Sequence, residues 1–327
     1  MILIVLAGYL LNPTDSNPLK PCIALSYPVP ASQTKSGLVE YGKGKKDIPF
    51  LIFYTVFFTF TREFVMQRLI RPVGIWFGIN KKGKIARFME QSYTAVYYTF
   101  FGPYGLYVMY HTPIWYFNTR AFWEDYPHLT HTADFKAYYL LQGAFWAQQA
   151  IVLILQLEKP RKDFKELVLH HIVTLALIGC SYRFHFTWIG LAVYITHDVS
   201  DFFLATSKTF NYIDVSFIGP YFVLFAASWI YCRHYINLVI LKSVLTEMRT
   251  VGPWSSGEID WDAGLFKGPL AQKVTFILLG SLQAVNLFWL YLIFKIARRY
   301  AWPGAGEKLE DVRSEDEDDA DSTGGEP

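Results

Sequence analysis

The sequence predicts an all-α protein, a polytopic bundle of transmembrane helices, chiefly because its apolar residues come in long blocks. Of its 327 residues, 52% are hydrophobic and 18% aromatic. Blocks of this kind differ from the one-sided apolar stripe of a soluble amphipathic helix. The three cysteines, two of them inside apolar blocks, provide neither a disulfide framework nor a paired zinc-binding motif. These features together favour a membrane bundle over soluble domains.

Seven apolar segments are long enough to cross a hydrocarbon layer about 30 Å thick. The first contains Arg62 and Glu63, and the fourth and fifth are short and polar, so tilted helices or helices buried within the bundle are expected. The expected spans are residues 48–68, 93–111, 138–157, 167–184, 188–206, 215–240 and 274–296.

The two ends of the chain differ from the predicted membrane domain, residues 48–302. Residues 1–47 are expected to form an N-terminal segment and a lumenal loop. Their first eleven residues are apolar but too short to cross, which suggests either the end of an incomplete eighth span or a segment lying on the membrane surface. Residues 303–327 form an acidic tail that is disordered by composition. In it, Ser314 precedes three acidic residues, as in an acidic-directed kinase site, although a purely solubilising tail explains the charges equally well.

The charge distribution predicts the topology. The net charge of +2 hides ten acidic residues in the last 21, and the rest of the chain has 28 basic and 18 acidic residues. Loop 158–166 holds four Lys and Arg, whereas loop 112–137 holds two, so the first should face the cytosol and the second the lumen. Alternation then places residues 81–87, Lys208, the basic end at 295–299 and the tail in the cytosol. These placements require an odd number of spans after residue 48.

Two of the predicted spans carry ionisable side chains. His170 and His171 stand near the start of one, and His197, Asp198 and Asp201 lie in the next. Each charged group at membrane depth costs roughly 2.5 to 3.5 kcal/mol on insertion scales, so a functional site is the default interpretation. The two spans are joined by a very short connection and run antiparallel, and both sets of side chains fall in the cytosolic half.

The spacing of these residues predicts how they meet. His197 and Asp201 are four residues apart and Asp198 and Asp201 three apart, so all three share one helical face, as do His170 and Thr174. A carboxylate beside an imidazole can orient the ring, fix its tautomer and support it as a base or a nucleophile.

Two alternatives remain open for this cluster. Intramembrane His and Asp side chains can simply pair across helices and stabilise their packing. A di-iron site of the desaturase type is the chemical alternative, but it needs many closely spaced histidines. The only other close pair here, His128 and His131, falls on the lumenal side. Neither alternative explains five costly groups in two neighbouring segments as well as an active site does.

The residues around this cluster resemble a known family. LEKPRKDFKELVLHHIVT (157–174) and YITHDVSDFFLATSKTFNY (194–212) are similar to the longevity-assurance motif of the ceramide synthases, within the TLC domain. The similarity extends from residue 40 to 302 and looks fungal, and the homeobox-like insert of many animal members is absent. Further matching segments are DIPFLIFYTVFFTFTREF (47–64), GPYGLYVMYHT (102–112), AFWAQQAIVLILQLEKPRKD (144–163), IYCRHYINLVIL (230–241) and LQAVNLFWLYLIFKIA (282–297).

The resemblance implies a TLC-domain barrel of helices in the endoplasmic reticulum membrane that joins the acyl group of a fatty acyl-CoA to the amine of a sphingoid base, dihydrosphingosine or phytosphingosine. The essential histidine pair of the family maps onto His170 and His171, and its motif aspartates onto Asp198 and Asp201. Position 197 varies in the family, so His197 is a supporting residue, with Thr174. The implied partners are membrane lipids, a small single-span accessory subunit and a second synthase in a homo- or heterodimer. No cofactor, metal or nucleic acid is implied.

The substrates suggest how they bind. Acyl-CoA has a polyanionic head and an apolar chain, so a cytosolic mouth leading to a tunnel between helices is expected. Trp146, Gln148 and Gln149 are candidate tunnel residues, although ordinary helix packing explains them equally well. Candidate phosphate contacts, which topology alone also explains, are Lys81, Lys82, Lys84, Arg87, Lys159, Arg161, Lys162, Lys165 and Lys208. Non-enzymatic TLC-domain proteins, which bind lipid or assist translocation, are the alternative function, but they should lack the complete histidine and aspartate set.

Overall fold

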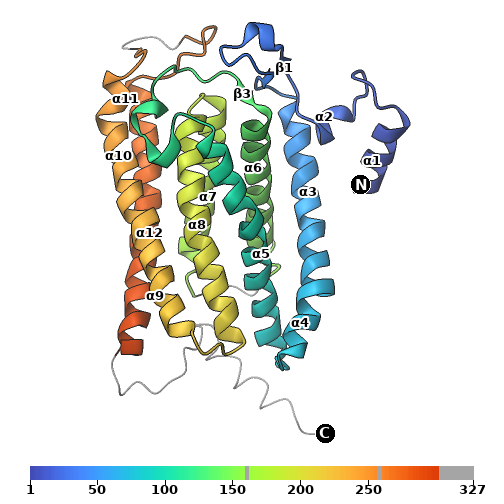
Figure 1. Cartoon of the computed structure of the whole chain (residues 1–327), viewed down its shortest axis with the longest axis vertical. Coiled ribbons are helices and arrows are strands. Elements are labelled where there is room, and N and C mark those ends of the chain that lie inside the picture. Colours follow the sequence, from blue (N-terminus) through green and yellow to red (C-terminus); the bar gives the residue numbers. More distant parts are fainter. Residues whose placement is uncertain (159–161, 256–259, 302–327) are drawn as a thin grey trace.

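Long helices that run along one axis make up most of the structure (Figure 1). This computed structural model describes residues 1–158, 162–255 and 260–301. Within these residues a helical stretch occurs at every predicted span, which confirms the all-α class. The stretches are α3 (Asp47–Val65) continued by a π-helical turn (Met66–Ile70) and α4 (Arg71–Trp76); α5 (Lys82–Tyr110); α6 (Ala133–Ile154); α7 (Phe164–Arg183); α8 (Thr187–Tyr212); α9 (Ile218–Trp229) continued by a π-helical segment (Ile230–Ile236) and α10 (Asn237–Leu245); and α12 (Pro269–Ala301).

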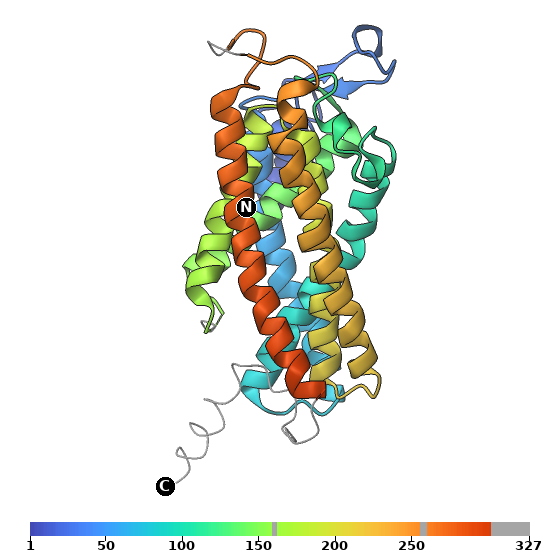
Figure 2. The same cartoon turned by 90° about the vertical axis from the view of Figure 1, so that its left-hand side faces the viewer.

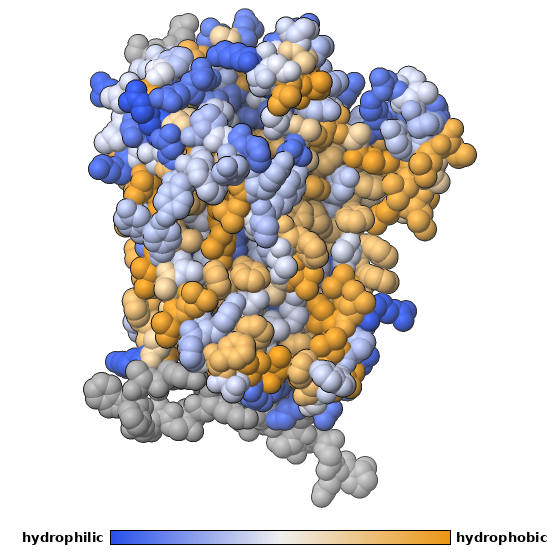
Figure 3. Space-filling view, viewed as in Figure 1, coloured by the Kyte–Doolittle hydropathy of each residue, from blue (hydrophilic) through white to orange (hydrophobic). Residues whose placement is uncertain are grey.

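Four of these stretches are long and apolar enough to cross a membrane. They are Asp47–Trp76, Phe164–Arg183, Ile218–Thr250 and Pro269–Arg298. The other three, α5, α6 and α8, are less apolar because they carry many of the polar side chains of the bundle interior. On the face seen in Figure 3, hydrophobic residues cover much of the middle of the bundle, and hydrophilic residues gather at the end near the strands. The predicted membrane bundle is therefore supported.

The remaining elements lie at one end of the bundle, which we call the sheet end (Figure 1). Strands β1 (Pro28–Val29), β2 (Glu40–Tyr41) and β3 (His131–Thr132) form a small antiparallel sheet in the order β1-β2-β3. It fastens the N-terminal segment to the start of α6. The other elements here are α1 (Ile2–Leu11), α2 (Lys20–Ile23), α11 (Glu247–Thr250) and the 3₁₀ turns Ala31–Gln33, Trp115–Phe117 and Arg120–Phe122.

The opposite end of the bundle contains basic segments that the sequence assigned to the cytosolic side. Connections 77–81 and 213–217 and the C-terminal part of α12 all lie there (Figure 1). Helix α5 begins at Lys82 instead of the predicted residue 93. The reason is that Lys and Arg are good helix formers, whereas hydropathy detects only the apolar part of a helix.

The hairpin between α6 and α7 ends part of the way along the bundle, above the ends of its neighbours (Figure 2). Its Glu158 forms an ion pair with the buried Arg62 of α3, which lies about 20 Å of helix before Trp76 at 1.5 Å per residue. Asp163 accepts a hydrogen bond from Trp289 Nε1 of α12 at 3.0 Å. These contacts hold Glu158, after α6, and Asp163, before α7, against α3 and α12.

Aromatic packing in the centre of the bundle positions the residues of the site. The ring of Tyr97 on α5 stacks on Phe145 of α6, with centroids 3.5 Å apart. About two helical turns further along α5, any Cβ at Gly105 would collide with the hydroxyl end of Tyr138 on α6. Glycine at this position therefore leaves room for the Tyr138 hydroxyl, which donates to Asp198 in the interior.

A buried ion pair joins the starts of α3 and α6. Lys136 Nζ lies 2.7 Å from Asp47 Oδ1, and the two side chains are 0% and 4% exposed. The ammonium also donates to the carbonyl oxygens of Ser26 and Gly42, and the Tyr182 hydroxyl donates to the Asp47 carboxylate. The N-terminal segment and three helices thus depend on one pair of charges.

We expect Asp47→Ala to lower the free energy of unfolding by about 3–5 kcal/mol, because it leaves the Lys136 charge buried without its counter-ion. The control is Lys35→Ala, which breaks an exposed ion pair with Asp125 and should cost no more than about 1 kcal/mol. Denaturant unfolding of the purified protein in detergent micelles measures both. Equal losses in the two variants would contradict this account of the buried pair.

A candidate active site inside the bundle

Three imidazoles meet in the bundle interior, as the sequence predicted. Helix α7 supplies His170 and His171, whose ring centroids are 5.7 Å apart, and α8 supplies His197, 6.4 Å from His170. The Trp146 ring of α6 lies 5.5 Å from His170 and 5.8 Å from His171, and the Trp289 ring of α12 lies 5.2 Å from His170. Four helices therefore enclose the cluster, and the indole rings limit its access to water.

Backbone carbonyls fix the tautomers of two of these rings. His171 Nδ1 lies 2.9 Å from the Leu167 carbonyl oxygen, and His197 Nδ1 lies 2.8 Å from that of Val193. Because a carbonyl oxygen only accepts, each Nδ1 carries a hydrogen, which leaves a lone pair on Nε2 of the neutral ring. His197 Nε2 and His170 Nδ1 are both buried without a hydrogen-bond partner. Such nitrogens can accept a proton or attack an electrophile.

Asp198 points away from the imidazoles. Its Oδ2 accepts hydrogen bonds from the Tyr138 hydroxyl at 2.7 Å and from Gln142 Nε2, and the Gln142 Oε1 accepts one from Tyr97 at 3.0 Å. Its Oδ1 is buried and has no partner. In the described part of the chain we find no hydrogen bond from this carboxylate to an imidazole, contrary to the expectation. The reason is that successive helical residues diverge by about 100°, so His197 faces α7 while Asp198 faces α5 and α6.

Asp201 is paired with an arginine that the sequence analysis did not assign. Arg233 Nη2 lies 2.5 Å from Asp201 Oδ1, and the Tyr98 hydroxyl lies 3.4 Å from Oδ2. The same guanidinium, only 1% exposed, donates to Ser200 Oγ at 2.7 Å and Asn286 Oδ1 at 3.0 Å. Asp201 therefore balances a buried positive charge and ties α8 to α12 and the π-helical segment Ile230–Ile236.

The remaining predicted site residues fall into three groups. Thr174 and Trp146 lie at the cluster, and the Thr174 hydroxyl and Trp146 Nε1 have no partner. Gln148 is buried with its amide unpaired, while Gln149 and Lys208 are half-buried and Lys162 is exposed. Lys159 and Arg161 lie outside the described residues, as does the tail with Ser314.

An apolar cavity of about 70 Å³ begins at the imidazole cluster. Trp146, Thr174, Tyr194 and His197 line it, and mostly apolar side chains of α6, α7, α8 and α12 make up the rest of the wall, with Phe186 toward the sheet end. A cavity with one polar end and a long apolar wall suits a molecule with a reactive polar group and a hydrocarbon chain.

The two histidines at the sheet end, His128 and His131, are packed against other side chains. The His128 ring stacks on Trp188 with centroids 3.9 Å apart, and burial lowers the pKa of His128 to about 4. His131 Nε2 lies 2.8 Å from the Thr187 hydroxyl. Over residues 1–158, 162–255 and 260–301, no group of three or more His, Cys, Asp or Glu is arranged to hold a metal ion.

Sequence reasoning missed five residues of this centre. Arg233 had a usable signal, because an arginine within an apolar span is costly and therefore meaningful. Tyr138, Gln142, Tyr194 and Trp289 had none, since aromatic and amide residues occur throughout these helices. Only the packing shows which of them face the interior.

We expect Tyr138→Phe to lower the free energy of unfolding by about 1–3 kcal/mol, because it removes a donor from a buried carboxylate. Tyr104→Phe is the matched control, since the Tyr104 hydroxyl also makes one hydrogen bond, to the Asp134 carbonyl, but in an exposed position. Denaturant titrations of both variants provide the comparison. If Tyr138→Phe is no less stable than the control, Asp198 does not depend on this bond.

Apolar helices around a buried set of imidazoles, carboxylates and an apolar cavity define a multi-pass membrane protein with an internal polar site. A family model described as the TLC domain matches residues 87–295, so the chain belongs to the TLC-domain family.

The chain is 52% identical over 320 residues to sphingosine N-acyltransferase lac1 of Schizosaccharomyces pombe, covering 98% of this chain and 80% of the relative. It is 47% identical over 321 residues to ceramide synthase LAG1 of Saccharomyces cerevisiae, covering 98% and 75%. With ceramide synthase 4 of Mus musculus, the identity is 31% over 246 residues, covering 74% and 57%. The resemblance identified from the motifs is thereby confirmed.

Proposed function

We propose that this protein is a sphingosine N-acyltransferase, a ceramide synthase. It transfers the acyl group of a fatty acyl-CoA to the amine of dihydrosphingosine or phytosphingosine and releases a ceramide and CoA. The names of its relatives support the reaction. The structural observation that carries the proposal is the cluster of three imidazoles, two of which have a buried unpaired nitrogen, at the polar end of an apolar cavity.

The chemistry needs what this cluster offers. A sphingoid amine is protonated in water and must lose a proton before it attacks the thioester carbonyl. His170 or His171 either assists as the base or first accepts the acyl group as an acyl-imidazole, which divides the reaction into two steps. Burial between Trp146 and Trp289 protects such an intermediate from hydrolysis. Asp198 and Asp201, which the sequence predicted to be catalytic, act as positioning residues in this proposal, because their carboxylates bind Tyr138, Gln142 and Arg233 and so hold in place the helices around the imidazoles.

The two parts of the acyl-CoA substrate bind in different environments. The acyl chain lies in the cavity, past Trp146, with the two glutamines of α6 close to its path. The CoA phosphates remain at the cytosolic side, where Lys159, Arg161, Lys162 and Lys208 bind them. The hairpin between α6 and α7 carries three of these cations, and its position within the bundle brings the soluble head of the substrate near the imidazoles.

The charges and the family support a proposed cellular setting, the endoplasmic reticulum membrane. With seven spans, the C-terminal end would be cytosolic, because all the basic connections would then share that side of the membrane. The catalytic TLC domain covers residues 48–302, between a lumenal segment and a cytosolic acidic tail. A small single-span accessory subunit and a homo- or heterodimer with a second synthase are the proposed partners, and the reaction requires no cofactor and no metal.

A non-enzymatic role is the second candidate function. TLC-domain proteins that bind lipid or assist translocation would use the same bundle and cavity without turnover. The structural observation that favours the enzyme is the set of unpaired buried nitrogen atoms, since a pure binding site for hydrocarbon has no need of them.

We expect the purified protein to form ceramide from acyl-CoA and a sphingoid base. His170→Ala and His171→Ala should each lower turnover by at least about 10²-fold, because each removes a proton acceptor or nucleophile. Product is measured by mass spectrometry. The matched control is His111→Ala, because His111 Nδ1 also bonds the carbonyl four residues earlier, at 2.9 Å, but lies on the exposed surface. Wild-type turnover in both alanine variants, with both folded, would refute the assigned roles, and binding without turnover by the wild type would favour the second candidate.

A further inference from the structure

The polar end of the cavity concentrates unpaired hydrogen-bonding groups. Trp146 Nε1, Thr174 Oγ1, Tyr194 Oη and His197 Nε2 all belong to lining residues, and each atom is buried without a partner. A buried polar group without a partner costs about 1–3 kcal/mol, and native proteins keep few of them. Four at one end of one cavity indicate a site whose partners arrive with a ligand.

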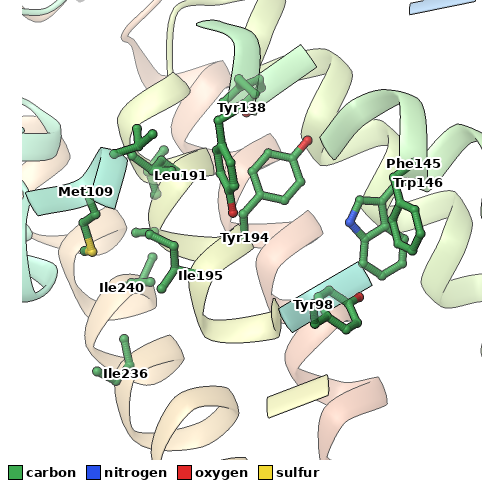
Figure 4. Close-up of a cluster of buried hydrophobic side chains, with 14 of the residues drawn as sticks. Tyr98, Met109, Tyr138, Phe145, Trp146, Leu191, Tyr194, Ile195, Ile236 and Ile240 are labelled. Atoms are coloured by element: carbon green, nitrogen blue, oxygen red, sulfur yellow. The ribbon is translucent and has the colours of Figure 1, made fainter. Parts of the chain in front are cut away.

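The four groups have complementary roles. The Trp146 indole can only donate, and the hydroxyls of Thr174 and Tyr194 have hydrogens to donate. His197 Nε2 can only accept, because Nδ1 of this ring already donates to the Val193 carbonyl. In Figure 4 the Tyr194 hydroxyl and the Trp146 nitrogen point toward the space between the two rings. Tyr194 and His197 are three residues apart on α8 and therefore present their groups on one face.

Three donors and one acceptor match the needs of an acyl transfer to an amine. The carbonyl oxygen of the acyl group becomes negative when the amine adds, and donors placed around it lower the barrier. The attacking nitrogen must give up a proton, for which it needs an acceptor on its own side. The apolar remainder of the cavity lies where the hydrocarbon chain would extend.

We propose that this end of the cavity is the point of acyl transfer, where Tyr194, Thr174 and Trp146 bind the carbonyl oxygen and His197 accepts the proton of the amine. The proposal rests on the proposed function and makes His197, Tyr194 and Thr174 catalytic residues beside the histidine pair. Among the described residues, the cavity lining includes His197 but neither His170 nor His171, which places His197 closest to a chain held there.

The acyl group passes to the amine by addition to the carbonyl carbon followed by loss of CoA. The neutral amine nitrogen forms a bond to the carbonyl carbon, and the carbonyl oxygen becomes an oxyanion held by the three donors. The nitrogen proton passes to His197 Nε2, the oxyanion re-forms the carbonyl, and the carbon–sulfur bond breaks. The CoA sulfur then takes the proton from His197 and leaves as the thiol. If His170 has first accepted the acyl group, the CoA sulfur has already taken the proton of the His170 ring and left as the thiol. The bond between the carbonyl carbon and the His170 nitrogen then breaks instead, and this nitrogen takes the pair of electrons and the proton from His197, which restores both neutral rings.

The oxyanion donors are tested with Tyr194→Phe and Thr174→Val, which remove hydroxyls but keep the shape of the side chains. We expect kcat for ceramide formation to fall by about 10²-fold or more in each, with little change in the KM for acyl-CoA, because the bonds form mainly in the transition state. Tyr104→Phe is the matched control. The Tyr104 hydroxyl donates to the Asp134 carbonyl in an exposed position, and Tyr104 is not among the described residues that line the cavity, so kcat should stay near the wild-type value.

Wild-type kcat in both variants, or the same loss in Tyr104→Phe, would overturn the assignment of the donors. Wild-type turnover is measured in the same experiment. Ceramide formation by the wild type and by both variants would therefore refute this inference and leave the proposed function intact, whereas an inactive wild type would refute the function itself.

The proton acceptor is tested with His197→Gln and two acceptors of the acyl group, a sphingoid base and its analogue with an aminooxy group in place of the amine. The aminooxy group is neutral at neutral pH and depends much less on a base. We expect turnover relative to the wild type to fall about 10²-fold or more with the amine and much less with the analogue. Equal losses with both acceptors, in a variant with the wild-type unfolding midpoint, would contradict the assignment. If this variant does not fold, the two hydroxyl variants decide the proposal.

Discussion

The structure depends on the high cost of placing an ionisable or polar group inside an apolar bundle. The buried charge of Lys136 is neutralised by Asp47. That of Arg233 is neutralised by Asp201, and Ser200 and Asn286 accept further hydrogen bonds from its guanidinium. Arg62 is neutralised by Glu158, and this pair also fixes the hairpin between α6 and α7 at its depth. Because each of these charges has its partner on another element, satisfying them fixes the arrangement of the helices.

The candidate site is a region where several buried polar atoms lack partners. His170, His197 and Asp198 each keep a buried atom without a partner, as do Trp146, Thr174 and Tyr194 next to the cavity. The paired charges around the site hold its helices rigid, so these atoms cannot easily move to find partners. A preorganised set of unpaired donors and acceptors in a water-poor space is the condition under which electrostatic catalysis is strongest.

The sequence predicted the helical bundle, the order of its helices and the meeting of His170 and His171 with His197, because hydropathy and helical spacing are local properties. It did not predict which way Asp198 faces, since that depends on the rotation of α8 against α5 and α6. It also did not predict that Glu158 pairs with Arg62, because no local signal links two residues so far apart in the chain. Tyr194 was missed because its hydroxyl matters only through its position beside Trp146 and the cavity.

In the proposed mechanism, the helix pair α7 and α8 supplies the reactive groups of a membrane-embedded acyl transfer, and α6 and α12 complete the enclosure. The most direct test is an experimental structure of the protein with a non-hydrolysable acyl-CoA analogue. The account predicts an acyl chain in the cavity between α7, α8 and α12, with the carbonyl group between His197 and Tyr194 and the CoA moiety on the side of the α6–α7 hairpin. An acyl chain bound on the outer surface of the bundle, with the imidazoles out of reach of the carbonyl carbon, would contradict it.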